Sequence, residues 1–161
     1  MSVDNQEIAR VFTRIADLLE IKGELVHKVL AYRRAAEAIA EMGEDIREYQ
    51  REGRLTDIPG VGKALSEKID ELLTTGRLAY LARLEQEVPP GLLEVRAIPG
   101  VGAKTVRLLW QQLGITSLAD LEAAAQAGRL KSLPGLGEKS EARIIAGIAA
   151  LRGKTGGSGQ A

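Results

Sequence analysis

IPGVG at residues 58–62 occurs again at residues 98–102, and residues 133–137 read LPGLG. Each copy places a proline before a glycine-apolar-glycine triplet, and each precedes a segment with apolar residues at helical spacing. After the third copy these residues are Ile144, Ile145 and Ile148, which are expected on the apolar face of a helix. Proline fixes φ, and glycine adopts backbone angles that are closed to other residues, so each copy predicts a tight turn that leads into a helix. The three turns between helices therefore organise the whole chain.

The same helical spacing continues on the N-terminal side of the first repeat. Asp4 and Glu7 form a capping box that begins a first helix, and Gly23 is expected to end it. A second helix is expected between Leu25 and about residue 42, and a shorter one over residues 45–51. No stretch alternates apolar and polar residues as a half-buried strand does, so the sequence predicts an all-α fold.

The chain is expected to divide at Pro89-Pro90-Gly91. Residues 1–88 then hold the first repeat, and residues 89–152 hold the second and third as a four- or five-helix unit. Both are predicted to be small helical subdomains built around their hairpin turns. Residues 153–161 are rich in glycine and are predicted to form a flexible tail.

Composition excludes several classes of protein. The chain has no cysteine, which removes disulfides, thiolate zinc sites and cysteine nucleophiles, and its single histidine leaves common metal and triad sites without parts. No apolar run approaches the ~18 residues of a membrane span, and the N-terminus lacks the apolar core of a signal peptide. The expected setting is the cytoplasm, with no membrane partner.

The charge balance argues for local rather than bulk contact with nucleic acid. The 22 basic and 22 acidic residues cancel, which disfavours a protein that coats DNA electrostatically. Residues 1–80 hold 12 basic and 15 acidic side chains, whereas residues 88–161 hold 9 and 5. Aromatic residues are 3% of the chain, so a stacking platform for single strands is not expected.

The repeated turn has the chemistry of an anion pocket. Glycines let a ligand approach the main chain, and the helix that follows offers unpaired N–H groups and the positive end of its dipole. Three such pockets suit the regularly spaced phosphates of a polyanion, and contact through phosphates reads no base sequence. The expected contacts are Gly60, Gly62, Gly100, Gly102, Gly135 and Gly137, with Lys104 and Lys139 beside the second and third turns.

These segments could instead be ordinary turns between helices, which also favour proline and glycine. Three copies of one five-residue pattern favour the binding role. A nucleotide loop of the P-loop type is excluded at the second copy, because Ala103 stands where glycine must precede the lysine. The dinucleotide fingerprint fails there as well, because Thr105 replaces its third glycine.

Several strings resemble the N-terminal region of family-X DNA polymerases, the polymerase-beta-like enzymes. They are His27-Lys28 with Ala31-Tyr32-Arg33, the first repeat, and Glu67-Lys68-Ile69-Asp70-Glu71 with Thr75-Gly76. The repeats themselves resemble helix-hairpin-helix motifs. The resemblance runs to about Leu151 and implies a lyase-like domain followed by a fingers-like domain.

The resemblance implies a role in base excision repair, with DNA that is gapped or nicked and carries a 5′-phosphate as the partner. It places His27, Lys28, Tyr32 and Lys63 near that phosphate, and a K⁺ or Na⁺ ion at hairpin carbonyls near Gly60 and Gly100. No other cofactor is expected. Mg²⁺ would matter only where a palm domain is present, since this chain has no Asp-x-Asp pair and is not expected to polymerise DNA.

By the same resemblance, Lys68 is the nucleophile of a 5′-deoxyribose phosphate or abasic-site lyase. A lysine attacks in its neutral form, so partial burial or nearby cations must favour loss of its proton. Two departures weaken the match: Ala64 and Tyr80 stand at positions that are basic in the family. Lys68 is otherwise a solvated lysine or an ion-pair partner of Glu71.

The roles of Tyr32 and His27 stay open at the level of sequence. Tyr32 fits a core position as well as a contact with sugar, and His27 fits an ordinary surface residue. The chain is expected to be a monomer, and either a piece of a polymerase or a stand-alone relative. A helical protein-interaction scaffold without catalysis is the remaining hypothesis, and it predicts no salt-dependent affinity for DNA.

Overall fold

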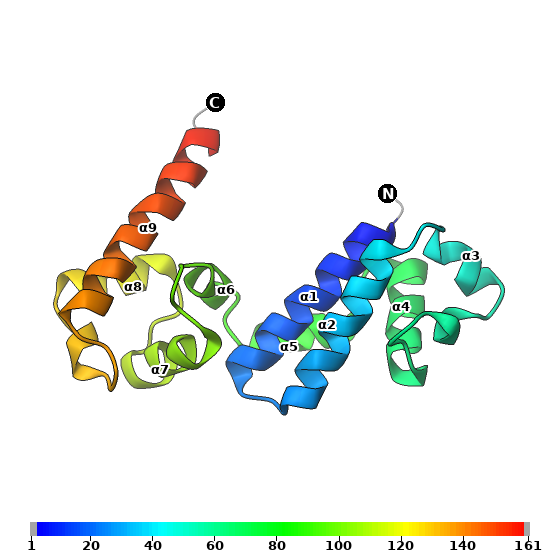
Figure 1. Cartoon of the computed structure of the whole chain (residues 1–161), viewed down its shortest axis with the longest axis horizontal. Helices are drawn as coiled ribbons and strands as arrows, with labels where there is room; N and C mark the ends of the chain where they lie inside the picture. The colour runs from blue at the N-terminus through cyan, green and yellow to red at the C-terminus, as the bar shows by residue number, and fades with distance from the viewer. Residues whose placement is uncertain (1–2, 160–161) are drawn as a thin grey trace. The chain divides into compact units, whose positions relative to one another are not determined.

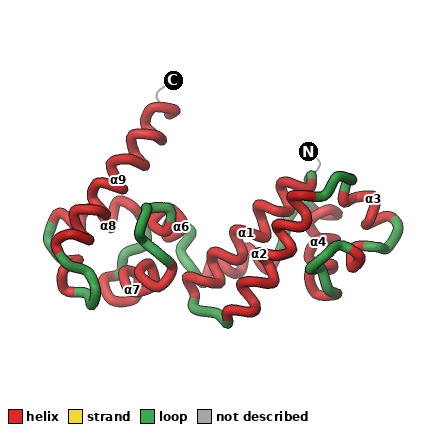
Figure 2. The backbone as a smooth tube through the Cα atoms, in the orientation of Figure 1, coloured by secondary structure: helices red, strands yellow, loops and turns green. Residues whose placement is uncertain are grey.

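The computed structural model describes residues 3–159, and the side chains of residues 3–153, as helices joined by short loops (Figure 1). The first half contains α1 (Asn5–Lys22), α2 (Val26–Glu41), α3 (Ile46–Arg51), the 3₁₀ turn η1 (Leu55–Asp57), α4 (Lys63–Thr75) and α5 (Ala79–Glu87). The second contains α6 (Leu92–Arg96), α7 (Ala103–Leu113), α8 (Leu118–Gln126), η2 (Leu130–Ser132) and α9 (Glu138–Gly159). Figure 2 shows no strand in this range, which confirms the all-α prediction.

The chain separates into two compact units, residues 1–87 and 88–161. The division lies one residue before the Pro89-Pro90 pair. Helix α9 continues through Gly159 into the segment for which the sequence predicted a tail. Residues 160–161 lie outside the described residues, and the flexibility of residues 153–161 stays a prediction. Among the described helices, none is both long and apolar enough to cross a bilayer.

In the first unit, α1 and α2 pack side by side in opposite directions (Figure 1). Asp4 accepts a hydrogen bond from the Glu7 N–H at 2.9 Å, and Gly23 ends α1 at φ +91°, so both predicted boundaries are confirmed. Helix α5 returns to α1, where Arg14 Nε donates to Glu85 at 3.0 Å. The core of this unit is formed by residues of α1, α2, α4 and α5, which are Phe12, Ile15, Leu19, Val29, Ile39, Ile69 and Leu84.

The second unit closes around the helix that follows the third repeat. Gly147 of α9 lies against Ile98, so that a Cβ on this glycine would come within 2.5 Å of Ile98 Cγ2. The core includes Leu92, Val95, Ile98, Val106, Leu109, Leu121, Leu130 and Ile148. Ile145 was expected on the apolar face of α9, but it retains 39% of its exposure, so that assignment was wrong. Ile144 and Ile148 suffice to cover one face of the helix.

Candidate nucleic-acid interface

The three proline-glycine repeats fold into the same closed turn. The Val61 N–H donates to the Ile58 carbonyl at 3.0 Å, and the equivalent bonds in the second and third copies are 3.0 and 3.2 Å. The first glycine of each copy has φ of +80°, +85° or +80°, which other L-residues adopt only with strain. Proline followed by a glycine at positive φ is a type II turn. The repeat is therefore the sequence that this turn requires.

The second glycine of each repeat precedes the first turn of the following helix. Gly62 and Gly102 are the N-caps of α4 and α7, and neither helix receives a side-chain hydrogen bond at this cap. N–H groups of the first turn are therefore left without an intrahelical partner, at the positive end of the helix dipole. A Cβ on either glycine would find nothing within 4 Å, so a ligand has room to reach the backbone.

The residues that the sequence nominated at the hairpins are all exposed: Gly60, Gly62, Lys63, Gly100, Gly102, Lys104, Gly135, Gly137 and Lys139. In the first two copies, the apolar residue between the two glycines is buried. Val61 and Val101 retain only 4% and 5% of their exposure. Each valine thus anchors its turn in the core, while the glycines on either side face solvent.

The first hairpin lies against the middle of α2. A Cβ on Gly60 would lie 3.6 Å from the Ala35 nitrogen and 3.7 Å from Arg34 Cβ. Arg34 also lines a shallow groove beside the turn, together with Glu37 and Pro59. Arg34 was not predicted from the sequence. Its only signal was its position directly after the string from His27 to Arg33.

Lys68 lies on α4, six residues after Gly62, and it is half-buried. Its Nζ lies 4.9 Å from the centre of the Tyr80 ring, a cation–π contact. The Tyr80 ring stacks on Tyr32 with centroids 6.1 Å apart, and Tyr32 meets Phe12 edge-on at 5.4 Å. The amine therefore rests on an aromatic stack that reaches into the core. Glu71 does not engage Lys68 in this arrangement, because its carboxylate accepts the Ala79 N–H at 2.8 Å.

Tyr32 is a core residue, with 6% of its surface exposed. Burial, followed by the neighbouring Tyr80, raises the pKa of Tyr32 well above that of a free phenol. From the sequence, Tyr80 was recognised only as a lost basic residue. Its place between Tyr32 and Lys68 was missed because the contact joins residues from three helices.

His27 and Lys28 are both exposed in the first turn of α2. Lys28 Nζ lies 4.0 Å from Glu24, which also lies 3.8 Å from Lys22. Lys22 in turn donates to Glu87 at 2.7 Å, and this hydrogen bond raises the pKa of Lys22 and lowers that of Glu87. The cations at this end of the unit are therefore interleaved with carboxylates rather than gathered into one basic patch.

The second and third hairpins meet within their own unit. They line a cavity of about 30 Å³ with Gly100 and Val101 from one hairpin and Leu136 and Ser140 from the other. The guanidinium of Arg143, from α9, would lie 3.7 Å from a Cβ on Gly100. Arg143 therefore brings a positive charge from the third motif to the turn of the second. The sequence had given no reason to choose it over other arginines.

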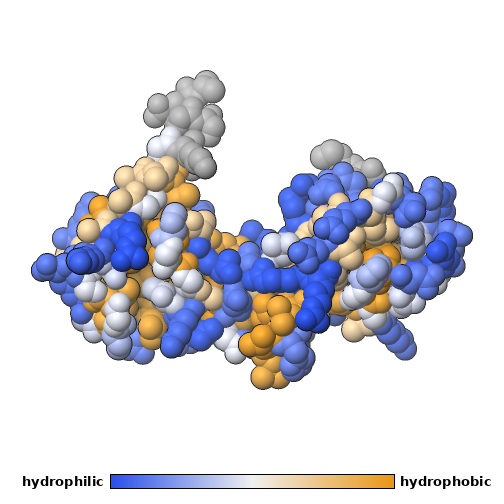
Figure 3. Space-filling model, viewed as in Figure 1, coloured by the Kyte–Doolittle hydropathy of each residue, from blue (hydrophilic) through white to orange (hydrophobic). Residues whose placement is uncertain are grey.

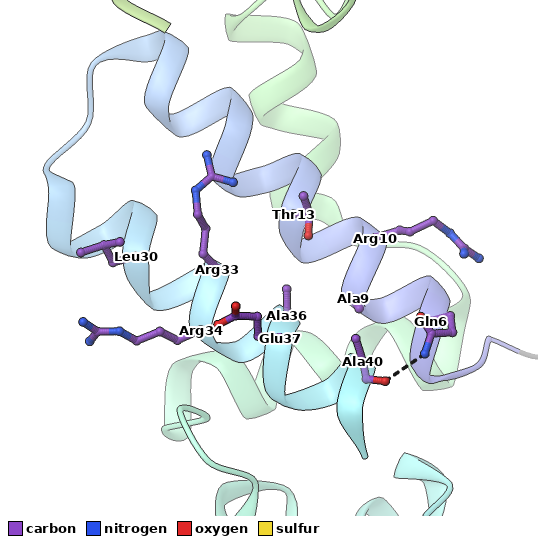
Figure 4. A pocket seen from close by; sticks show the side chains of 10 residues that line it. All are labelled: Gln6, Ala9, Arg10, Thr13, Leu30, Arg33, Arg34, Ala36, Glu37 and Ala40. Carbon is purple, nitrogen blue, oxygen red and sulfur yellow. Dashed lines mark hydrogen bonds between the residues drawn. The ribbon is translucent and has the colours of Figure 1, made fainter. Parts of the chain in front are cut away.

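A larger groove of about 650 Å³ lies along α1 and α2 (Figure 4). Alanines form part of its wall, and arginines 10, 33 and 34 line it as well. Gln6 donates to the Ala40 carbonyl at 3.0 Å at one end of the groove. Arg33 is paired with Asp17 at 2.9 Å. None of the site residues predicted from the sequence lines this groove.

The described residues contain no group of three or more His, Asp or Glu side chains that could hold a metal ion. Backbone carbonyls at the hairpins remain the candidate ligands for a monovalent ion. The Gly62 and Gly102 carbonyls each already accept one helical N–H, at 2.9 and 3.0 Å. A carbonyl oxygen has two lone pairs, so each retains a position for a second partner.

Comparison with known protein families finds two matches. Residues 3–78 match a helix-hairpin-helix domain, and residues 92–150 match a SAM-like helix-hairpin-helix tandem. The first therefore covers the unit with one repeat, and the second covers the two repeats of the other unit.

Similar proteins include enzymes that act on DNA. A DNA polymerase/3′-5′ exonuclease PolX from Bacillus subtilis is 32% identical over 140 residues, which is 87% of this chain and 24% of that protein. DNA polymerase lambda from Rattus norvegicus is 30% identical over 122 residues, or 75% of this chain and 20% of the relative. A Holliday junction branch migration complex subunit RuvA from Leptothrix cholodnii is 39% identical over 59 residues, 37% of this chain and 29% of that protein. The chain thus spans between a fifth and a third of these relatives.

Proposed function

Because the chain belongs to the family-X DNA polymerases, whose N-terminal helix-hairpin-helix region it matches, we propose that it grips gapped or nicked DNA through backbone phosphates. The observation that carries the proposal is the set of exposed type II turns, two of which lead into helices with uncapped N–H groups. Such turns hold phosphate oxygens without reading bases. The partner is therefore the DNA backbone.

The two units are proposed to contact different parts of the interrupted DNA. The single hairpin of the first unit would hold the 5′-phosphate on the downstream side of a gap. The second hairpin would hold the primer or template backbone, supported by the third hairpin and by Arg143. A gap that ends in a 5′-phosphate offers contacts to both units, whereas an intact duplex lacks the terminal phosphate.

Fluorescence anisotropy with matched DNA tests this proposal. The same duplex would be prepared intact, with a one-nucleotide gap ending in a 5′-phosphate, and with that gap ending in a 5′-hydroxyl. We expect the phosphorylated gap to bind about tenfold more tightly than the intact duplex, a difference of about 1.4 kcal/mol. Equal affinity for the gapped and intact duplexes would contradict the proposal.

A salt titration separates DNA binding from the scaffold hypothesis. Each phosphate that is neutralised lowers the logarithm of the affinity by about 0.9 per decade of salt. Replacement of Lys104 and Lys139 by glutamine should reduce that slope, while replacement of Lys131, which lies 3.8 Å from Glu138, serves as the control. A chain without salt-dependent affinity would be a protein-interaction scaffold.

We propose a second activity at Lys68, the cleavage of a 5′-deoxyribose phosphate. The amine would attack the C1′ aldehyde of the open sugar and lose water to form an imine. A water molecule would take a proton from C2′, and the electron pair would expel the C3′ oxygen, which leaves the DNA with a 5′-phosphate. Water would hydrolyse the imine and regenerate the amine. The observation that supports this role is the partial burial of Lys68 on the helix that follows the first hairpin.

Borohydride trapping on incised abasic DNA tests this activity. A covalent adduct that maps to Lys68, and that disappears in Lys68→Ala but not in Lys131→Ala, would support it. DNA binding without an adduct would leave the chain as a phosphate-gripping module. The binding and trapping experiments thus succeed or fail separately.

A monovalent cation is proposed at the first and second hairpins, near Gly60 and Gly100. Carbonyl oxygens are suitable ligands for K⁺ or Na⁺, and an ion there would join the turn to a phosphate. We expect weaker DNA binding when KCl is replaced by tetramethylammonium chloride at equal ionic strength. Equal binding in both salts would remove the ion from the proposal.

The chain is proposed to act as a monomer in the cytoplasm. Sedimentation velocity of the free chain and of its DNA complex would establish the number of copies. One copy per gap is expected, because each unit carries its own hairpins.

A further inference from the structure

The groove along α1 and α2 lies outside the hairpins of the first unit (Figure 4). Every residue that lines it belongs to one of these two helices, and its volume is about 650 Å³. On α2 the lining extends from Leu30 to Ala40, which is about 15 Å at the rise of an α-helix, or about three turns. The groove is therefore long enough to hold a segment of helix.

The wall of the groove is partly apolar. Ala9, Ala36 and Ala40 contribute to it, and their short side chains leave room above them. Leu30 lines the same groove and retains 38% of its exposure. Figure 3 shows moderately hydrophobic residues on the surface over α1 and α2, with hydrophilic residues beside them. Apolar side chains from a partner would fill the space over the alanines and remove Leu30 from water.

The charged residues of the groove leave two arginines available to a partner. Arg33 is paired with Asp17 at 2.9 Å and with Glu20 at 3.2 Å. Arg10 and Arg34 are exposed, and no ion pair among the described side chains includes either of them. Figure 4 shows their side chains extending to opposite sides of the groove. An occupant with an acidic residue on each side would pair with both arginines.

The lining fits a protein helix better than it fits DNA. Glu37 lines the groove, and it also lies with Glu41 and Arg34 in the shallow groove beside the first hairpin. A phosphate backbone that continued from the hairpin would therefore meet two carboxylates. None of the residues that line the larger groove is aromatic, so bases would find no ring on which to stack. A helix can carry an acidic residue beside each arginine and a neutral or basic residue beside Glu37, whereas every phosphate carries the same charge.

We propose that this groove docks an acidic amphipathic helix of a partner protein. The apolar stripe of that helix would lie against the alanines, and acidic residues on its two flanks would lie beside Arg10 and Arg34. An amphipathic helix that lays its apolar face in a groove is a recurring mode of protein recognition. The inference goes beyond the proposed function, because it gives the first unit a protein partner in addition to DNA.

Fluorescence anisotropy with a designed peptide tests the groove. The probe is a fluorescein-labelled helix with leucine and alanine on one face and glutamate on both flanks. It is stapled on its remaining face, because short helices are marginal in water. The comparison probe carries lysine in place of each glutamate.

Two variants of the chain address shape and charge separately. Thr13→Trp fills the groove from an exposed position, and Thr74→Trp, at an exposed position of α4, is its control. Arg10→Glu reverses one charge of the groove, and Arg51→Glu, at an exposed position of α3, is its control.

We expect the wild-type chain to prefer the glutamate peptide over the lysine peptide by about tenfold in affinity. Thr13→Trp should lose about tenfold in affinity for the glutamate peptide. Arg10→Glu should lose about fivefold for that peptide and should bind the lysine peptide more tightly than the wild type does. The two controls should bind as the wild type does, and saturating gapped DNA should leave the affinity for the peptide unchanged.

Equal affinity for the two peptides, or binding of neither, would overturn the docking proposal. Displacement of the peptide by gapped DNA would overturn it in favour of a DNA surface. Self-association of the wild-type chain that Thr13→Trp abolishes would overturn it in favour of a contact between copies. A wild-type chain that binds the glutamate peptide but no DNA would refute the proposed function alone.

Discussion

The two glycines of one hairpin have different reasons to be glycine. Gly60 has φ +80°, which strains other L-residues, so the turn itself favours glycine there, although a Cβ would lie at an ordinary contact distance of 3.6 Å from the backbone of α2. Gly62 has φ −91° and an extended backbone that any residue adopts, with nothing within 4 Å of a Cβ. The fold does not require glycine at position 62. The remaining reason for glycine at position 62 is that it leaves the N-terminus of α4 open to a ligand.

Gly62→Ser should therefore shift stability and DNA affinity in opposite directions. Serine at the N-cap can accept an N–H of the first turn of α4, which stabilises the fold by about 0.3 kcal/mol relative to glycine. The same hydroxyl occupies a donor that phosphate would use, so affinity for gapped DNA should fall several-fold. Thermal melting and anisotropy on one preparation measure both quantities.

Gly60→Ala is the comparison for that variant. An L-residue at positive φ is strained by about 1–2 kcal/mol, so this change should lower the melting temperature. An unchanged affinity in Gly62→Ser, despite a higher melting temperature, would show that the N–H groups of α4 do not hold DNA.

At the scale of elements, α9 is held by close contact as well as by apolar burial. Gly147→Ala would place a Cβ 2.5 Å from Ile98 Cγ2, and a β-branched side chain has little freedom to move away. We expect a loss of about 1–3 kcal/mol from overpacking, partly offset by the better helix propensity of alanine. Gly153→Ala, in the same helix with nothing within 4 Å, should be neutral or stabilising. Urea unfolding of both variants checks the contrast.

Helix α8 begins with a reciprocal cap. Asp120 accepts the Thr116 N–H at 3.1 Å, and its own N–H donates to Ser117 Oγ at 3.1 Å. The bond from the Thr116 backbone, followed by that from the Thr116 hydroxyl, lowers the pKa of Asp120 below its ordinary value of 3.8. A carboxyl with a lowered pKa stabilises the fold above that ordinary value and loses its effect as the pH falls through the pKa of the folded state.

Asp120→Ala should therefore lower the melting temperature at neutral pH, and by less as the pH falls below 3.8. Melting curves of both chains from pH 7 down to the acid limit of folding measure the difference. Asp120→Asn, which keeps an acceptor oxygen, should lie between them. A difference that is constant with pH would mean that the carboxylate charge contributes nothing to the cap.

The elements were predictable from sequence wherever a local rule decides them. Asp4, Gly23 and the glycines of the repeats set helix boundaries through caps and turns that involve only neighbouring residues. Ile145 was assigned to the wrong face, because its spacing fits the apolar stripe and only the packing of α9 shows that the stripe ends before it. The exposure of Leu25 was likewise hidden by its helical spacing with Val29.

At the scale of the whole molecule, the chain consists of two compact units, and they carry different spectroscopic probes. Its single tryptophan, Trp110, lies half-buried in α7 of the second unit. Circular dichroism reports both units. Units that unfold separately should give a tryptophan transition whose midpoint in urea differs from that of the dichroism.

Gly147→Ala should shift the tryptophan transition and leave part of the dichroism transition in place. Val61→Ala, which truncates a buried residue of the first unit, should do the reverse. A single transition that both variants shift equally would show that the two units unfold together.

The candidate interface was predictable from sequence next to the repeats, and not where it joins residues that are far apart in the chain. The hairpin glycines and the lysines beside them follow from a pattern that repeats along the chain. Lys68 contacts Tyr80 of α5, which stacks on Tyr32 of α2. The positive charge beside Gly100 comes from Arg143 of α9. Contacts between segments that are far apart in sequence leave no periodic signal, so only the structure assembles them.

The positive φ of the first hairpin glycines has a consequence for chirality. A φ near +80° is the mirror image of an angle that L-residues favour, so it suits a residue of the opposite hand. D-alanine at Gly135, introduced by peptide ligation, should rigidify the turn, whereas L-alanine at the same position should strain it, although a Cβ there meets nothing within 4 Å. The enantiomers have the same size and polarity, so the difference in their melting temperatures would measure the preference of this backbone for handedness alone.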